Sequence, residues 1–191
     1  MFYLFTAIFA VIYTSLFEWM LHRYVMHRPF LGFDYAFKAH ALTHHVIFKA
    51  DKSYHLTNDA DKHTIPMAWW NCLILIPLSS LPSIPISLYL HSWWISVITI
   101  LTISLYYGTY EYIHWCMHLP KPTKRIFEAG WVFRKINGHH LLHHRYPNRN
   151  LNVVLPLADT ILGTLLLRSP VKFAQATGPS VPDVQPKHIH V

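Results

Sequence analysis

The sequence contains few acidic residues, few cysteines and few glycines for its length. Of 191 residues, nine are Asp or Glu, two are Cys and six are Gly. Only three of the acidic residues are glutamates and only one Glu-x-x-His motif occurs, so the carboxylate ligands of a soluble di-iron bundle are missing. The two cysteines, Cys72 and Cys116, form neither a zinc spacing nor a disulfide framework, and we interpret them as packing residues.

The signatures of several other enzyme classes are also absent. No His-Glu-x-x-His sequence occurs, which excludes a zinc protease of that type, and there is no glycine-rich phosphate loop or recognisable Ser or Cys nucleophile motif. The basic residues give a net charge of +7 with histidine neutral, but they flank apolar segments instead of gathering beside polar surface. We therefore expect no nucleic-acid partner and interpret them as topology signals that contact anionic lipid headgroups.

Apolar residues make up 52% of the chain and aromatic residues 15%, a composition typical of membrane proteins. Three segments, 2–21, 67–90 and 93–113, each have the length of about 20 residues that a helix needs to cross a bilayer. A fourth apolar segment, 151–167, is short and interrupted by polar residues, so we expect a re-entrant or interface-lying helix there. The sequence thus predicts an all-α integral membrane helical bundle with three to four membrane-embedded helices.

One domain, residues 1–168, is predicted to form this bundle, and residues 169–191 are predicted to be a flexible C-terminal tail. If the three spans alternate in direction, every Lys and Arg lies on one side, since none precedes the first span and none lies in the turn near His91. The positive-inside rule then places the N-terminus outside and the polar segments in the cytosol. We therefore expect a multi-pass protein whose site is on the cytosolic face.

Ten of the sixteen histidines fall into four tight clusters, each at the end of an apolar segment or just beyond it. Neutral imidazole is the commonest protein ligand for zinc, copper, iron and nickel. Because ten such ligands exceed what one metal ion holds, the sequence predicts two metal ions in a histidine-rich cap at the membrane surface. The four clusters are His22 and His27; His40, His44 and His45; His114 and His118; and His140, His143 and His144.

Two of these clusters have a spacing that suits ligands on a regular helix. His114 and His118 are four residues apart and therefore share a face. His140, His143 and His144 follow an i, i+3, i+4 pattern and also share a face.

The other two clusters leave two arrangements open. His22 and His27 are five residues apart, about 140° around an ideal helix, so they either reach different metals or the helix unwinds between them. His40, His44 and His45 present the same two possibilities.

The remaining histidines have a simpler interpretation, with one exception. His139 competes with His140 as the ligand on that turn. The others are interpreted as amphipathic packing residues near the membrane interface: His55, His63, His91, His188 and His190.

Two carboxylates, Glu18 and Glu111, are the only acids within the three predicted spans. A charge buried in a membrane segment is costly and usually functional. Glu18 precedes His22 by four residues and Glu111 precedes His114 by three, so each acid shares a helix face with a candidate ligand. We expect each to accept the second N–H of a ligand imidazole, which fixes its tautomer, and to offset the metal charge. The alternative is a helix-end acid that points to water.

In order along the chain, the four clusters resemble the histidine boxes of the fatty acid hydroxylase superfamily. That group includes sterol desaturases, fatty acid hydroxylases and, more distantly, carotenoid hydroxylases. The likeness extends from about Phe17 to Leu165. The matching stretches are residues 18–27 (EWMLHRYVMH), 40–45 (HALTHH), 110–118 (YEYIHWCMH), 140–144 (HLLHH) and the ending at 152–164 (NVVLPLADTILGT).

The resemblance implies a non-haem di-iron oxygenase. Such enzymes use two iron ions and O2 to insert oxygen into an unactivated C–H bond of a lipid, with electrons from a separate cytochrome or ferredoxin. The ten clustered histidines would be the iron ligands, although all-histidine sites also hold zinc. Glu18, Glu111 and Asp159, the last within the family-like ending, would support the ligands, and Tyr110 and Tyr112 would line the site.

Several alternatives share part of this pattern. A lipid desaturase or a carotenoid ring hydroxylase would use the same boxes, and their spacing does not separate these reactions. A membrane metal-binding or transport protein is the non-enzyme alternative. A transporter should place its ligands along a path near mid-membrane, whereas these clusters lie at one face.

Overall fold

In the computed structural model, residues 1–120, 128 and 130–168 are described, and within them all regular structure is helical. This agrees with the predicted all-α class. The predicted tail at 169–191 lies outside the described residues. The elements are α1 (Phe2–Leu21), η1 (His22–Met26), α2 (Tyr35–Ala39), η2 (His40–His44), α3 (His45–Ile47), η3 (Lys52–Tyr54), η4 (Asp59–Thr64), α4 (Asn71–Ser80), α5 (Ser83–Tyr89), α6 (Trp94–His118), α7 (Trp131–Arg145) and α8 (Leu157–Ile161).

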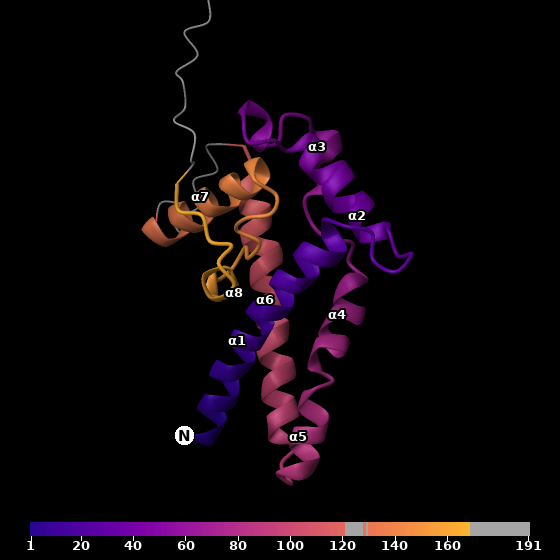
Figure 1. Ribbon diagram of the computed structural model, residues 1–191, viewed down its shortest axis with the longest axis vertical. Coiled ribbons are helices and arrows are strands. Elements are labelled where there is room, and N and C mark those ends of the chain that lie inside the picture. The colour runs from indigo at the N-terminus through magenta and orange to yellow at the C-terminus, as the bar shows by residue number, and fades with distance from the viewer. Residues whose placement is uncertain (121–127, 129, 169–191) are drawn as a thin grey trace, which may run out of the picture.

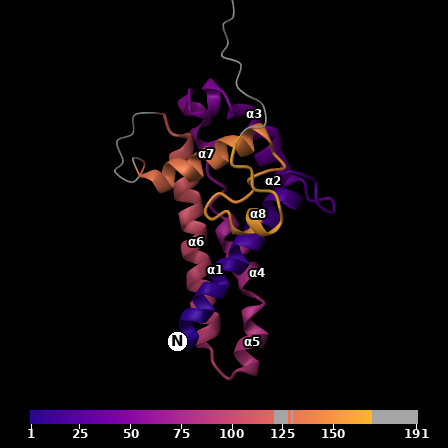
Figure 2. The same ribbon diagram turned by 60° about the vertical axis from the view of Figure 1, so that its left-hand side comes forward.

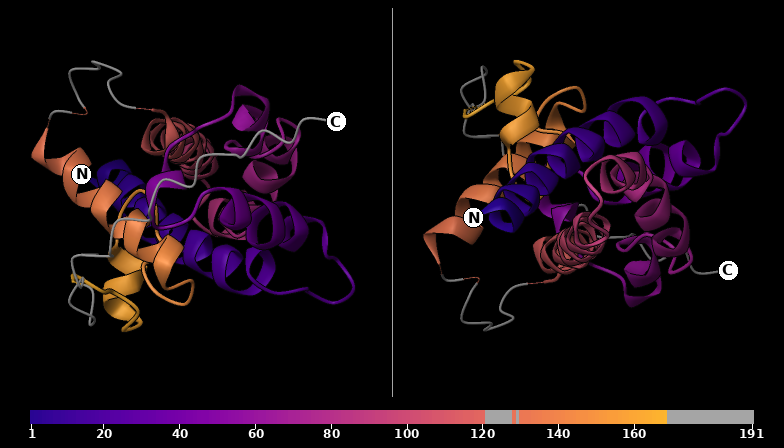
Figure 3. Two further views of the ribbon diagram at one scale, coloured as in Figure 1. Left: turned by 90° about the horizontal axis from the view of Figure 1, so that it is seen from above. Right: turned by 90° about the horizontal axis from the view of Figure 1, so that it is seen from below.

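Three rods form the long part of the molecule, with α6 between α1 on one side and α4 followed by α5 on the other (Figure 1). The third rod is broken at Leu81 and Pro82, because a proline lacks the N–H that would continue the helix. Viewed along the long axis, α6 is seen nearly end-on (Figure 3). Large apolar side chains such as Phe9, Leu73 and Leu105 are exposed on the outer faces of the rods.

Two helical stretches among the described residues, Phe2–Met26 and Asn71–Tyr89, are long and apolar enough to cross a membrane. The third expected span corresponds to α6, a continuous helix of 25 residues. It is not among these two stretches, since Ser, Thr and Tyr residues along it lower its hydropathy. The number of spans therefore stays a prediction.

A cap of short helices covers one end of the rods, opposite the N-terminus and the turn between α5 and α6 (Figures 1 and 2). Its buried apolar cluster includes Tyr54, Met117, Phe133 and Val153, which come from four separate parts of the chain. Cys116 belongs to this cluster, and neither cysteine is part of a disulfide within the described residues. The largest apolar core thus lies under the cap and holds its segments in place.

The segment expected to be re-entrant or interface-lying forms no membrane-length helix. It contains the five-residue helix α8, which packs against α1. Gly163 follows with a φ of +69°, a left-handed conformation that glycine adopts without steric cost. We call residues 150–164, which include α8, the site loop.

Candidate metal centre

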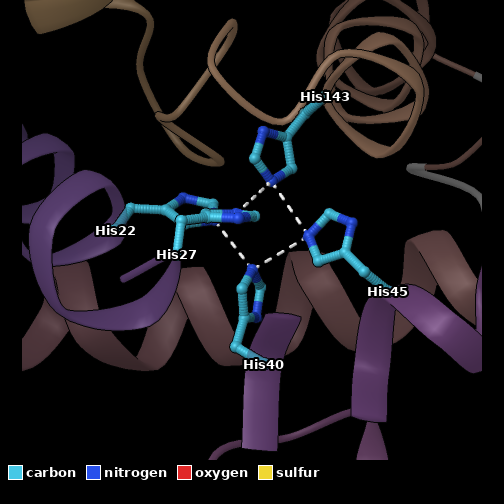
Figure 4. Close-up of side chains that lie close together, drawn as sticks. All are labelled: His22, His27, His40, His45 and His143. Atoms are coloured by element: carbon cyan, nitrogen blue, oxygen red, sulfur yellow. Dashed lines mark hydrogen bonds between the residues drawn. The ribbon is translucent and has the colours of Figure 1, made fainter. Parts of the chain in front are cut away.

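The ten histidines of the four sequence clusters come together as two groups of five at the cap end of the rods. Within each group the ligand nitrogens all lie within 4.8 Å of one another. From here on we call these two spatial groups the first cluster and the second cluster. The first cluster contains His22, His27, His40, His45 and His143 (Figure 4). The second cluster contains His44, His114, His118, His140 and His144.

Two π-helices decide between the arrangements that the five-residue spacings left open. In η1 the backbone N–H of His27 donates to the His22 carbonyl at 3.1 Å, and in η2 the N–H of His45 donates to the His40 carbonyl. This i→i+5 bonding widens the turn and brings residues five apart toward one face. Both pairs therefore face the first cluster together, while His44 faces the second.

The regular helices α6 and α7 supply the other ligand candidates. His114 and His118 both face the second cluster, in agreement with their four-residue spacing. On α7, His140 and His144 also face the second cluster, whereas His143 faces the first. His139 belongs to neither group and is half-buried, with its carbonyl accepting a bond from the Asn150 side chain.

Five of the ten imidazoles have their outer nitrogen, Nδ1, bonded to a backbone carbonyl. Because a carbonyl can only accept, each of these Nδ1 atoms carries the proton, and Nε2 presents a lone pair toward the cluster. This is the arrangement in which metal-bound imidazoles are usually oriented. The pairs are His22 with Leu151, His44 with Thr64, His118 with Tyr54, His143 with Arg149 and His144 with Phe48.

The inner nitrogens lie at distances that suit a shared metal ion. The Nε2 atoms of His118 and His144 lie 3.1 and 3.0 Å from Nε2 of His140, which carries at most one proton and cannot donate fully to both. Two ligands at right angles on a metal, with bonds of about 2.1 Å, would have nitrogens about 3.0 Å apart. Nε2 of His44 and Nε2 of His114 are buried without a hydrogen-bond partner. A cation in the second cluster would satisfy all of these lone pairs.

The first cluster has the same geometry. Nε2 of His40 lies 2.9 Å from Nε2 of His22 and 3.0 Å from Nε2 of His45. Nε2 of His143 lies 3.2 Å from that of His27 and 3.1 Å from that of His45 (Figure 4). The donor set therefore fits one metal ion in each cluster.

Burial keeps the cap imidazoles neutral, which is the state a metal ligand requires. Burial lowers the pKa of His44 to about 4, although the bond to the Thr64 carbonyl opposes this shift. Burial, followed by the charges of His22 and His44, lowers the pKa of His27 to about 3. At neutral pH both side chains present lone pairs and carry no positive charge.

The sequence matches the fatty acid hydroxylase family over residues 7–164, most of its length. The chain belongs to this family. No curated protein and no solved structure matches it. Membership implies a lipid-modifying oxidoreductase, and together with the two apolar stretches it indicates a membrane protein. The family is typically iron-dependent, and the two histidine clusters could bind such metal ions.

In this family member Glu18 does not contact an imidazole directly but holds the site loop. Its carboxylate accepts bonds from the Tyr106 hydroxyl at 2.6 Å, the Asn152 amide at 3.0 Å and the Val153 N–H at 2.6 Å. The neighbouring residue of the loop, Leu151, offers its carbonyl to His22. Glu18 therefore supports His22 indirectly, through the backbone of the site loop, and not by the direct contact that their four-residue spacing predicted.

Asp159 holds the same loop from within. Its carboxylate is fully buried and accepts bonds from the N–H of Leu151 at 2.9 Å, the N–H of Asn152 at 2.7 Å and the Thr164 hydroxyl at 2.6 Å. Together, the two acids fix the stretch of backbone that orients His22.

Glu111 bonds to a different segment from the one we expected. Its carboxylate accepts the N–H of Met67 at 3.2 Å and so ties the chain entering α4 to α6. Its support of His114 therefore stays a prediction. Of the two expected lining residues, Tyr110 packs against the His114 ring and lines a cavity, whereas Tyr112 is 51% exposed on the outer face of α6.

A narrow, almost entirely apolar cavity of about 50 Å³ between α1, α4 and α6 reaches His22 and Met26. A larger apolar cavity of about 430 Å³ lies between α1, α5 and α6, and Ser79 lines both cavities. Two further residues that line the narrow cavity, Tyr106 and Tyr107, were not predicted from the sequence. Their only signal was a position three or four residues before Tyr110, on the same helix face.

Proposed function

We propose that this chain is a membrane-bound non-haem di-iron oxygenase that hydroxylates a C–H bond of a lipid. O2 would be the co-substrate, and a separate donor of the cytochrome or ferredoxin type would supply electrons. The observation that carries the proposal is the pair of five-imidazole clusters with converging Nε2 atoms, next to an apolar cavity. When bound, two iron ions would supply the redox chemistry that no side chain provides.

The residues of the chain would divide the remaining work among them. The first and second clusters would each hold one ion, with backbone carbonyls fixing the imidazoles whose Nδ1 atoms they accept. The two cavities would bind an apolar lipid chain, extended along α1 past Ser79, so that it ends beside His22. The aromatic rings of Tyr106 and Tyr110, which line the narrow cavity, would keep bulk water away from its end beside His22.

The arrangement of the rods supports a proposal for how the chain is placed in the membrane. We propose that α1, α4–α5 and α6 cross the bilayer, with the N-terminus and the α5–α6 turn outside and the cap in the cytosol. The rods expose apolar side chains along their outer faces, and the basic residues lie toward the cap, which supports this orientation. The clusters would then lie at the cytosolic boundary, within reach of both lipid and a soluble donor.

Mass spectrometry of total lipids tests the proposed reaction. Cells expressing the intact chain are compared with cells expressing the His143→Ala, His144→Ala double variant, which removes one candidate ligand from each cluster. His139→Ala is the matched control, because it changes an adjacent histidine outside both clusters.

A lipid species that gains one oxygen with the intact chain and with the control, but not with the double variant, supports a hydroxylase. A species that loses two hydrogens instead identifies a desaturase. Purified protein without bound metal, together with unchanged lipids, would contradict the di-iron proposal.

A further inference from the structure

A two-residue hairpin lies between η1 and α2, in the part of the chain that links His22 and His27 to His40 and His45. The N–H of Phe30 donates to the Phe33 carbonyl at 3.0 Å, and the N–H of Phe33 donates to the Phe30 carbonyl at 2.7 Å. The two central residues, Leu31 and Gly32, have φ values of +47° and +83°. This left-handed turn favours Asn-Gly or Asp-Gly, so leucine at its first central position is sterically disfavoured. We call residues 30–33 the tip hairpin.

The tip hairpin exposes apolar surface, although the ring of Phe33 lies 6.2 Å from the ring of Tyr35 just after it. Leu31 is 92% exposed, and Phe30 and Phe33 are about half exposed. A Cβ atom built on Gly32 meets no other atom within 4 Å. In Figures 1 and 2 the connection before α2 projects sideways from the cap end of α1. Contacts within the described structure therefore do not compensate for the strained, exposed leucine.

The tip hairpin lies where two apolar rods end. It follows η1, which continues α1, and the ring of Tyr35 just after it packs 5.2 Å from the ring of Trp70, next to the start of α4. Trp69 beside it is 77% exposed. Exposed aromatic residues at the ends of membrane helices are typical of the bilayer interface. The exposed Arg28 lies two residues before Phe30 and suits the phosphate of a lipid headgroup.

We propose that the tip hairpin inserts Phe30, Leu31 and Phe33 into the boundary between headgroups and acyl chains of the bilayer. The inference rests on the membrane placement given under the proposed function. Because the hairpin joins η1 to α2 and η2, this anchor sets the depth of the first cluster relative to the lipid. It therefore helps to select which carbon of a bound lipid chain reaches the site.

Fluorescence quenching in liposomes of phosphatidylcholine with phosphatidylglycerol tests the anchor. A small environment-sensitive fluorophore is attached to Leu31→Cys in a Cys72→Ser background, where serine can keep the 2.9 Å bond to the Trp69 carbonyl. Substitution at so exposed a position should not disturb folding. Lipids that carry a nitroxide near the headgroup, and iodide in the water, serve as the two quenchers.

Two matched probes make the result interpretable. Leu105→Cys reports the exposed face of α6, and Asp59→Cys reports an exposed position in the cap. We expect the nitroxide lipid to quench the Leu31 probe several-fold more than the Asp59 probe, and iodide to show the reverse order. Iodide quenching of the Leu31 probe equal to that of Asp59 would overturn the proposal. Protection from both quenchers would also overturn it, because a protein surface would then cover the tip.

The control at Leu105 distinguishes failure of the anchor from failure of the proposed membrane placement. If a nitroxide near the middle of the acyl chains quenches the Leu105 probe while the Leu31 probe stays in water, the membrane placement holds and the anchor is wrong. If nitroxide lipids quench neither probe, the membrane placement itself is wrong, and the anchor proposal that rests on it is wrong as well. The measurement needs no catalytic turnover, so loss of oxygenase activity would not change its result.

Discussion

Replacing Asp159 with asparagine is expected to loosen the site loop and, through it, the first cluster. One carboxylate oxygen accepts bonds from the Leu151 N–H and the Thr164 hydroxyl, and the other accepts the Asn152 N–H. The amide of asparagine can replace only one of these oxygens as an acceptor, and its NH2 group would face a buried N–H donor.

The magnitude follows from the kind of bond that is lost. A hydrogen bond to a charged group contributes about 1.5 to 3 kcal/mol, and a buried donor left without a partner adds its own desolvation cost. We expect Asp159→Asn to destabilise the protein by about 3 kcal/mol. The Leu151 carbonyl should then orient His22 less well, and the purified variant should bind less metal than the intact chain.

Thermal unfolding in detergent and metal analysis of the purified variant measure both effects. Asp34→Asn is the matched control, because it removes an exposed acid that pairs with Lys38 across one helical turn at 2.6 Å. Exposed pairs of this kind contribute about 0.3 to 0.5 kcal/mol. An Asp159→Asn protein with the stability and metal content of the control would refute the role assigned to the site loop.

Three further outcomes are expected from single changes. Tyr106→Phe removes the 2.6 Å bond to Glu18 and should lower the stability by about 2 kcal/mol while metal stays bound, as thermal unfolding and metal analysis would show. Ser79→Phe should fill space where Ser79 lines both cavities and shorten the lipid chains accepted, whereas Ser79→Ala should leave the product distribution unchanged in lipid mass spectrometry. His140→Ala should lower the metal content, whereas His139→Ala should not; equal losses would contradict the assignment of His140 to the second cluster.

Local spacing was enough to predict some features of the site. Residues four apart on regular helices, such as His114 and His118, do face one group. The five-residue spacing of His22 and His27 was ambiguous, because nothing in the sequence signals a π-helix. The structure supplies the missing turn geometry and assigns both residues to the same cluster.

Contacts between distant parts of the chain could not be predicted from spacing. Glu18 was expected to face His22 four residues away, but it bonds to Asn152 and Val153, more than 130 residues along the chain. The backbone carbonyls that orient the imidazoles could not be predicted either, because every residue has a backbone carbonyl. Only the packing of the cap decides which carbonyl meets which ring.

Iron content, measured for the intact chain and for one double variant of each cluster, tests directly whether each cluster holds its own metal ion. His27→Ala, His45→Ala changes only the first cluster, and His114→Ala, His118→Ala changes only the second. We predict two iron ions per intact chain and about one in each variant, because each cluster holds its own ion. One ion in the intact chain, or complete retention of iron in both folded variants, would contradict it.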